Sequence, residues 1–295
     1  MRGAQPGRAI EQAVQRGGAL RAGDRVLVAC SGGADSVALA AALHALDTPM
    51  KLELRLAHVN HALRASAWQD ECVAAYVASR LELPLDVLTI QAGGRAEQPL
   101  REARYAALAQ SAVRQGCNVV ATAHHAEDQS ETVLLALLRG AGPDGLRGMR
   151  ARRPLAEGVE LARPLLGLPS ETLREYCHAR ALPYAVDPSN AEPAQRRNAV
   201  REALDALRPL FPALDAAVAR AAQLISEDRA AAPRAELRRS IRDRLAGEDE
   251  LRDIDFEHVE AAVRALEAGR TGTFHMKPGV WLRIERGSIS EVGRE

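Results

Sequence analysis

Ser31-Gly32-Gly33-Ala34-Asp35-Ser36 lies between a strand-like apolar run, 25–30, and a helix-like run, 37–43. Two adjacent glycines allow a sharp turn that brings backbone N–H groups close to a ligand, and the helix that starts there adds the positive end of its dipole. The order of strand, glycine turn and helix therefore predicts a phosphate-binding loop. The simpler alternative is an ordinary turn in which Ser31 or Asp35 caps the helix.

Two common phosphate-binding loops are excluded by what this stretch lacks. A Walker loop needs a lysine directly after its second glycine, but the only lysines are Lys51 and Lys277, neither of which is near the turn. The G-x-G-x-x-G pattern of dinucleotide-binding folds is absent as well. The pattern S-G-G-x-D-S resembles the loop of the N-type ATP pyrophosphatases, the PP-loop family. That resemblance implies a loop that holds the leaving pyrophosphate of ATP, with Asp35 helping to hold Mg²⁺.

Composition indicates a soluble, globular chain. Its 295 residues are 47% hydrophobic and 26% charged, which is enough for one large domain and a small one. No apolar run approaches the ~18 residues of a membrane span, and the first residues lack the apolar core of a signal peptide, so we expect a cytoplasmic protein. The four cysteines form no C-x-x-C pair and predict neither disulfides nor a metal site; we expect each to be a small buried residue.

The formal net charge is zero, which by itself argues against a nucleic-acid partner. That argument is weak because all but two of the 39 basic residues are arginine. Arginine forks suit phosphates, and the flat guanidinium stacks on bases. A solvated, arginine-rich surface is the alternative explanation for each arginine cluster.

The first 210 or so residues alternate strand-like and helix-like patterns, as a Rossmann-like, doubly wound parallel sheet requires. The expected strands are 25–30, 52–58, 85–90 and 118–123, and the expected helices are 34–46, 67–83, 98–115 and 126–138. Ligands in such sheets bind at the carboxyl ends of the strands, so motifs at those ends should share one crevice. Residues 211–295 read as a smaller helical domain with a short β element near 271–284.

A second cluster opens the helix expected after the fourth strand: His124-His125-Ala126-Glu127-Asp128-Gln129-Ser130-Glu131-Thr132. Asp128 and Glu131 lie three residues apart and therefore on one helix face. Acids in a first helical turn are often only helix caps. The apolar residues at 133–138 predict a helix that is buried nearly all round, so its acids need a cationic partner, such as Mg²⁺ or an ammonium group. The spacing does not match H-E-x-x-H, which makes a zinc hydrolase unfavourable.

Several motifs, taken in order, resemble those of the tRNA(Ile)-lysidine synthetases. They are the loop at 31–36, His58 to Arg64, the run 124–132, the glycine-rich 138–149, Arg163-Pro164-Leu165-Leu166, Asp187-Pro188-Ser189-Asn190 and Arg197 to Arg201. The likeness covers about residues 24–201 and departs at two positions, Ala34 and Glu127. It implies a PP-loop catalytic domain at 1–210 and a small tRNA-binding domain at 211–295.

The resemblance implies a two-step ligation on the wobble cytidine of a tRNA(Ile) with a CAU anticodon. ATP adenylates the C2 carbonyl oxygen, and the ε-amine of free L-lysine then displaces AMP. Catalytic roles fall to Asp35, Asp128 and Glu131, of which Asp128 and Glu131 would hold the lysine. ATP contacts fall to 31–36 and to His58, Arg104 and His124. Substrate contacts fall, besides the two acids, to Asn60, His61, Arg64, His125, Arg139, Arg197, Asn198 and Arg201. A homodimer is expected from related enzymes.

Three alternatives stay open. A tRNA thiolase of the same superfamily would share the loop but should carry paired active-site cysteines, which are absent here. An amidating synthetase would adenylate a small molecule and would need no arginine-bearing C-terminal region. A protein that merely binds nucleotide or RNA would release no pyrophosphate.

Overall fold

The computed structural model describes residues 6–60, 67–90, 97–141, 143–185, 195–229, 236–238, 240–241, 245, 256–277, 280–285 and 287–294. Its contacts divide the chain into two compact units, Met1–Arg220 and Ala221–Glu295. Each unit is described by itself. The sequence placed the boundary after residue 210.

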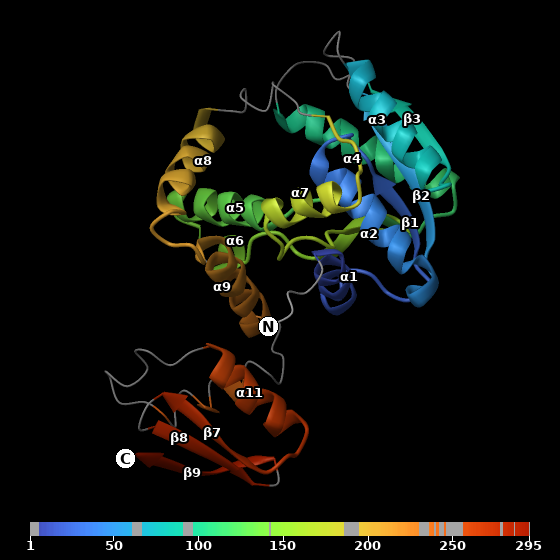
Figure 1. Ribbon diagram of the computed structural model, residues 1–295. Coiled ribbons are helices and arrows are strands. Elements are labelled where there is room, and N and C mark those ends of the chain that lie inside the picture. The colour runs from blue at the N-terminus through green and yellow to red at the C-terminus, as the bar shows by residue number, and fades with distance from the viewer. Residues whose placement is uncertain are drawn as a thin grey trace. The chain divides into compact units, whose positions relative to one another are not determined.

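The first unit is built on a six-stranded sheet, shown in Figure 1, with the order β3-β2-β1-β4-β6-β5. All neighbouring strands are parallel except β5 and β6, which form an antiparallel hairpin. This confirms the predicted doubly wound sheet. The hairpin at one edge was not predicted. The strands are β1 (Arg25–Ala29), β2 (Glu53–Asn60), β3 (Leu85–Thr89), β4 (Val119–Ala121), β5 (Arg152–Ala156) and β6 (Val159–Ala162).

Helices cover both faces of this sheet, because successive residues of a strand point to opposite sides. In β1, Val26 and Val28 belong to one core, together with residues of α1, α2, α3 and α7, whereas Leu27 belongs to a second core with α4. The helices of the unit are α1 (Pro6–Arg16), α2 (Ala34–Met50), α3 (Ala67–Arg80), α4 (Glu97–Arg114), α5 (Ala126–Leu138), α6 (Pro143–Leu146), α7 (Ser170–Ala179), α8 (Gln195–Leu207) and α9 (Leu214–Arg229), the last running past the division between the units.

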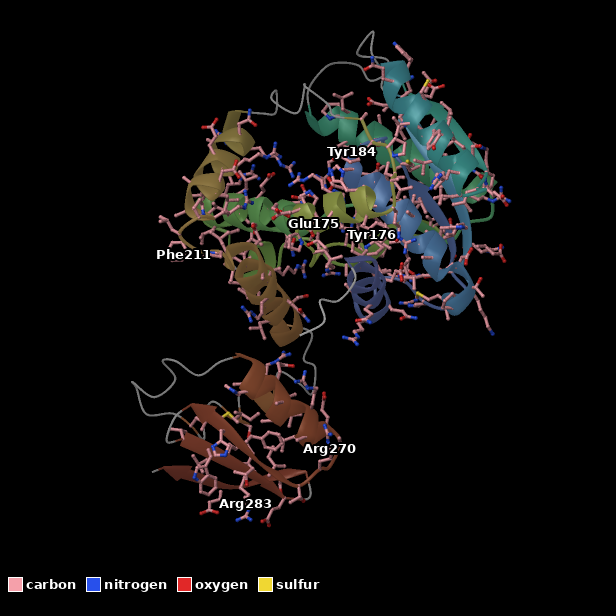
Figure 2. The ribbon with its side chains drawn as sticks, in the orientation of Figure 1. Glu175, Tyr176, Tyr184, Phe211, Arg270 and Arg283 are labelled. Carbon is pink, nitrogen blue, oxygen red and sulfur yellow. The ribbon has the colours of Figure 1, made fainter. Side chains whose placement is uncertain are left out.

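Individual side chains follow this layering. On α7, Tyr176 is buried in the first core and the neighbouring Glu175 is exposed; Phe211, just before α9, is exposed too (Figure 2). Cys30, Cys117 and Cys177 are buried as expected, but Cys72 on α3 is exposed, so the expectation for that cysteine is wrong. The structure offers no membrane-spanning helix among the described residues, where α4, at 18 residues, is the longest.

The second unit contains an antiparallel sheet of β7 (Gly272–Lys277), β8 (Val280–Glu285) and β9 (Ser288–Arg294), against which α11 (Phe256–Glu267) packs. Alternate residues, such as Leu282 and Ile284, enter a core with Val263 of the helix. The sequence predicted the helix and a short β element but not the third strand.

A buried ion pair ties the β5–β6 hairpin to the start of β1. Arg152 Nη1 lies 2.7 Å from Asp24 Oδ2, and the two side chains are only 9% and 5% exposed. Asp24 also accepts hydrogen bonds from the Arg21 amide and Asn118. Burial opposes ionisation of Asp24, but these hydrogen bonds and the Arg152 charge outweigh it and hold its pKa below the usual value of 3.8.

We expect Asp24→Ala to lower the free energy of unfolding at pH 7 by about 3 kcal/mol, because it leaves the Arg152 guanidinium buried without its main partner. A carboxylate whose pKa is lowered by folding stabilises the fold above its unfolded pKa, and that stability is lost as the pH falls through the folded pKa. Urea unfolding should therefore show a smaller difference from wild type at pH 3 than at pH 7. The exposed Glu157→Ala is the control, and equal stability of the two variants at pH 7 would contradict the argument.

Candidate active site

The order of the strands places the predicted motifs side by side. β1 lies between β2 and β4, and Val28 of β1 is paired with Ala121 of β4. The chain continues from β1 to β2 on one flank, whereas β4 lies on the opposite flank, so the strand order reverses at β1. This reversal is the point at which open α/β sheets bind ligands, outside the carboxyl ends of the strands. The glycine loop follows β1 and the His124-His125 pair follows β4.

The loop after β1 requires glycine at one of its two glycine positions. Gly32 has φ 90°, and a Cβ there would lie 2.8 Å from the backbone oxygen of Asp70. Its own carbonyl accepts a hydrogen bond from the Ala185 amide at 2.9 Å. Gly33 is extended, with φ −74°, and is the N-cap of α2. Only Gly32 therefore needs a conformation that other residues avoid.

Hydrogen bonds inside the loop close it at the start of α2. Ser36 Oγ donates to the Gly33 carbonyl at 2.9 Å and accepts from the Ser31 amide at 3.1 Å. Within the described residues no side chain caps α2, so neither Ser31 nor Asp35 has the capping role of the simpler alternative. Ala34 begins the helix, and its carbonyl lies 3.4 Å from Cys177 Sγ on α7.

Asp35 of the loop meets the acid cluster of α5 at one imidazole. His125 Nε2 lies 3.6 Å from Asp35 Oδ2 and 3.5 Å from Asp128 Oδ2, while its Nδ1 lies 2.8 Å from Glu127 Oε2. Burial favours neutral histidine, but the hydrogen bond to Glu127 and the charges of Asp128 and Asp35 prevail and raise the pKa of His125 to about 9. The ring is therefore an imidazolium at neutral pH, and it offsets two acids that come from different strand ends.

Glu127 holds this imidazole rather than facing a ligand alone. Its carboxylate also accepts hydrogen bonds from the Ser170 amide and hydroxyl, at 3.0 and 2.9 Å, at the start of α7. Burial raises its pKa, but the His125 hydrogen bond and charge dominate and lower it to about 2. The sequence left the role of Glu127 open; the contacts make it a positioning residue that joins α5, α7 and His125.

The structure brings three of the predicted site residues together: Glu131, Arg197 and Arg201. Glu131 is buried, and its two oxygens lie 3.1 Å from Arg197 Nε and 2.7 Å from Arg201 Nε, both on α8. The partner that the sequence sought in a ligand is thus supplied by α8 of the same chain. Asn198 lies on α8 next to Arg197.

The prediction that α5 is buried nearly all round is wrong. Its first two turns are buried at Ala126, Gln129, Ser130 and Glu131, but Leu137 and Leu138 near its end are 55% and 69% exposed. The reason is that α5 packs mainly against α6 and α8 rather than under the sheet.

Two predicted ATP contacts are histidines with neighbours in the protein, His58 being buried and His124 half-buried. His58 Nδ1 lies 2.9 Å from the Cys30 carbonyl, and because a carbonyl only accepts, Nδ1 carries the proton. His124 Nδ1 lies 2.9 Å from the Thr122 hydroxyl. Burial lowers the pKa of His124 to about 2, and the charges of Arg163, Arg104 and Arg101 act in the same direction. His124 is therefore neutral, in contrast to its neighbour His125.

The remaining predicted residues contact other protein groups, are exposed, or lie outside the described residues. Asn60 donates to Glu71 Oε2 at 3.1 Å, and Arg104 stacks over the Tyr105 ring at 5.5 Å. Arg139 is the exposed C-cap of α5. His61 and Arg64 lie outside the described residues, as does the motif at 187–190.

Sequence reasoning missed Gln129 as a positioning residue. Its buried amide clamps the backbone of Met149, accepting from the Met149 amide at 2.8 Å and donating to the Met149 carbonyl at 3.1 Å. A Cβ at Gly148 would lie 2.7 Å from the same amide, so glycine is needed where the loop passes. The sequence did offer one indication of this role: Gln129 is a long polar residue in a helix that is otherwise rich in apolar residues.

The residues present fit a Mg²⁺ ion. Magnesium is commonly held by one or two carboxylates together with substrate phosphates and water. Asp35 supplies one such carboxylate, and its side chain is 37% exposed in the loop expected to bind phosphate. Among the described residues no group of three or more His, Cys, Asp or Glu side chains is arranged to hold a metal ion.

Comparison with known proteins identifies the family of the chain. A PP-loop domain model matches residues 6–207. The tRNA(Ile)-lysidine synthase of Alkalilimnicola ehrlichii is 45% identical over 227 residues, which cover 75% of this chain and 48% of that protein; that of Salinispora arenicola is 43% identical over 235 residues, 77% of this chain and 70% of that protein. The chain thus spans about half the length of the first relative.

Among solved structures, the U34-tRNA thiolase of Methanococcus maripaludis superposes with a TM-score of 0.62 at 16% identity, covering 75% of this chain and 78% of that one. At that identity the likeness shows a shared fold. The model match and the identities above lead to one assignment: the chain belongs to the tRNA(Ile)-lysidine synthase family of PP-loop proteins.

Proposed function

We propose that the chain ligates L-lysine to C2 of the wobble cytidine in a tRNA(Ile) with a CAU anticodon, consuming ATP and releasing pyrophosphate and AMP. The observation that carries the proposal is the meeting of Asp35 and Asp128 at His125, directly beside a glycine loop at the start of α2. The match to lysidine synthases over most of the chain supports the same reaction.

In the first step, the C2 carbonyl oxygen of the cytidine attacks the α-phosphorus of ATP, and pyrophosphate leaves. The amides of the loop and the N-terminus of α2 bind the leaving pyrophosphate. Mg²⁺ held by Asp35 would neutralise charge on the phosphates. We also propose that the neutral His124 and Arg104, whose charge acts on His124, contact the nucleotide.

In the second step, the ε-amine of lysine attacks C2 and AMP leaves. Of the two acids expected to hold lysine, Asp128 is the accessible one, because its side chain is 24% exposed whereas that of Glu131 is 4% exposed. Glu131 is already paired with Arg197 and Arg201, so we propose that it orients α8 beside the lysine. Residues 211–295 remain the proposed tRNA-binding region.

Asp128→Asn is expected to raise the apparent KM for lysine at least about tenfold and to slow the second step, with little change in the KM for ATP. Loss of the charge removes the attraction for the ammonium group, whereas an asparagine oxygen can still accept the hydrogen bond from the His125 amide. Glu202→Gln, at an exposed position of α8, is the control. An unchanged dependence on lysine would refute this role.

The direct test supplies ATP, Mg²⁺, L-lysine and a CAU tRNA(Ile) transcript, followed by nucleoside analysis and measurement of AMP. Lysidine should appear only when all four are present, with one AMP for each lysidine. Cytidine that stays unmodified under these conditions would refute the proposed function. Pyrophosphate release without tRNA would instead point to a small-molecule synthetase.

A further inference from the structure

A cluster of arginines surrounds one tyrosine ring on the side of the sheet covered by α4. The guanidinium carbons of Arg101 and Arg104 each lie 5.5 Å from the centre of the Tyr105 ring, and that of Arg153, from β5, lies 5.7 Å from it. An aromatic face attracts one cation, but it does not neutralise three that repel one another. The arrangement therefore carries an unbalanced positive charge.

Arg163 adds a fourth positive charge, and it is only 3% exposed. Its Nη1 donates to the Arg150 carbonyl at 2.7 Å, but among the described residues its Nε has no hydrogen-bond partner, and neither does the buried hydroxyl of Tyr105. Burial lowers the pKa of the Arg163 guanidinium, the adjacent Tyr105 hydroxyl opposes that shift, and the charges of Arg153 and Arg101 lower the pKa further. Buried donors without partners are rare in native proteins because each carries a desolvation penalty.

Acids do not balance these charges in the part of the chain that the structure describes: no carboxylate there forms an ion pair with Arg101, Arg104, Arg153 or Arg163. Other arginines of the unit show the contrast, since Arg152 pairs with Asp24 and Glu160, and Arg180 with Glu11. Guanidinium groups without neighbouring acids form the arrangement that favours binding of an anion.

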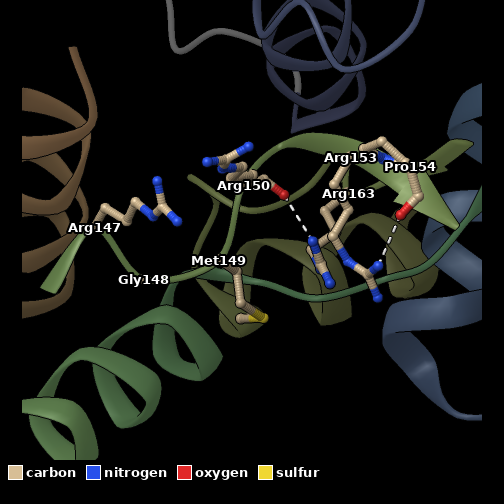
Figure 3. A pocket seen from close by; sticks show the side chains of 7 residues that line it. All are labelled: Arg147, Gly148, Met149, Arg150, Arg153, Pro154 and Arg163. Carbon is tan, nitrogen blue, oxygen red and sulfur yellow. Dashed lines mark hydrogen bonds between the residues drawn. The ribbon is translucent and has the colours of Figure 1, made fainter. Parts of the chain in front are cut away.

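A cavity of about 450 Å³ opens next to this cluster and is lined by Arg147, Arg150, Arg153 and Arg163 together with Met149 and Pro154. Figure 3 shows Arg163 and Arg153 close together on one side of it, with Arg163 bonded to the Arg150 carbonyl. The amide of Gln129 fixes the Met149 backbone and so fixes the loop that forms the other wall. The cavity has room for a phosphate group with its substituents.

We infer that Arg101, Arg153 and Arg163 extend the ATP contact already expected for Arg104 into a phosphate-binding subsite, and these four residues are the arginine cluster. Planar guanidinium forks match phosphate oxygens, and several of them together match a multiply charged anion better than a single carboxylate. The cluster adjoins the proposed active site, because α4, which carries Arg101 and Arg104, packs against β4, and His124 and His125 directly follow β4. The bound group is a phosphate of the nucleotide or of an RNA backbone, and the two sources are distinguished by experiment.

The test measures dissociation constants of the full chain for Mg-ATP and, separately, for a tRNA transcript at two salt concentrations. Arg101→Gln and Arg153→Gln are the test variants, since both residues are partly exposed, and Arg80→Gln on α3 is the control. We expect each test variant to weaken one ligand at least about tenfold. If the ligand is RNA, the salt dependence should also become shallower, by about one unit of slope for each phosphate that the variant no longer binds.

Arg153→Lys separates a ligand contact from a purely structural role. It keeps the charge, so it should recover a large part of the affinity that Arg153→Gln loses, while thermal melting should be the same for the Gln and Lys variants. Unchanged affinity for both ligands in folded Arg101→Gln and Arg153→Gln would overturn the inference. A change confined to the KM for lysine would also overturn it, because the anion would then be a carboxylate.

The inference stands apart from lysidine formation. Binding is measured with ATP and with RNA of unrelated sequence as well as with the CAU tRNA, so no turnover is needed. Suppose that the wild-type chain forms no lysidine but that the two Gln variants bind phosphate more weakly than the wild type does. That result would refute the proposed function and leave the phosphate subsite in place.

Discussion

Asp35→Asn is expected to slow pyrophosphate release from ATP by about a hundredfold to a thousandfold, the range seen when one group that stabilises transition-state charge is removed. Asp35 is the acid of the phosphate loop, and the same carboxylate faces His125 and Asp128. Its loss removes the loop's only carboxylate for Mg²⁺. It also removes one of the negative charges that lie beside the His125 imidazolium. Both effects act on the first chemical step rather than on the affinity for lysine.

The same substitution should leave thermal stability unchanged or slightly increased. Burial raises the pKa of Asp35, and the negative charges of Asp128 and Glu127 raise it further against the opposing effect of His125. An acid whose pKa is raised by folding destabilises the folded state at a pH above its unfolded pKa, so the neutral amide relieves that cost. Melting curves and single-turnover pyrophosphate release measure the two quantities.

Asp47→Asn, near the other end of α2, is the matched control and should retain full activity. A large drop in melting temperature for Asp35→Asn would mean that the carboxylate is structural. Wild-type pyrophosphate release in the same variant would show that the loop does not act on ATP through this acid.

Glu131→Gln is expected to lower the free energy of unfolding by about 3 kcal/mol and to reduce lysidine formation strongly. It leaves the guanidinium groups of Arg197 and Arg201 without the buried carboxylate that both contact, and breaking a buried ion pair by removing one partner is among the costlier single changes. The value is at the low end of the range for such pairs, because the Arg201 side chain is 39% exposed and water screens it.

Urea unfolding measures the stability, and the KM for lysine shows whether Glu131 contacts the substrate. We expect the stability to fall while the KM for lysine changes less than in Asp128→Asn. Glu175→Gln, at an exposed position of α7, is the control and should lie within about 0.5 kcal/mol of wild type. A Glu131→Gln variant of wild-type stability with a greatly raised KM for lysine would restore the role that the sequence assigned to this acid.

The strands that could be located from the sequence are those marked by a short run of neighbouring apolar residues. The four parallel strands expected at 25–30, 52–58, 85–90 and 118–123 agree with β1 to β4 to within a few residues, because each is a short apolar run bounded by polar residues or a turn. The hairpin of β5 and β6 was missed, because β5 contains Arg152, Arg153 and Pro154. Its place in the sheet depends on the pairing of Arg152 with Asp24, which is distant in sequence.

The amino-acid sequence by itself determined the phosphate loop, the alternation of strands and helices, and the two motifs that follow β1 and β4. Those features follow from backbone preferences and apolar patterns that span only a few residues. Only the tertiary structure decided which acids are paired with a charged group of the protein and which remain accessible to a ligand. Packing delivered His125 to Asp35, delivered α8 to Glu131, and gathered Arg101, Arg153 and Arg163 around Tyr105. Charge partners drawn from separate elements are set by the packing of those elements, and no local pattern specifies them.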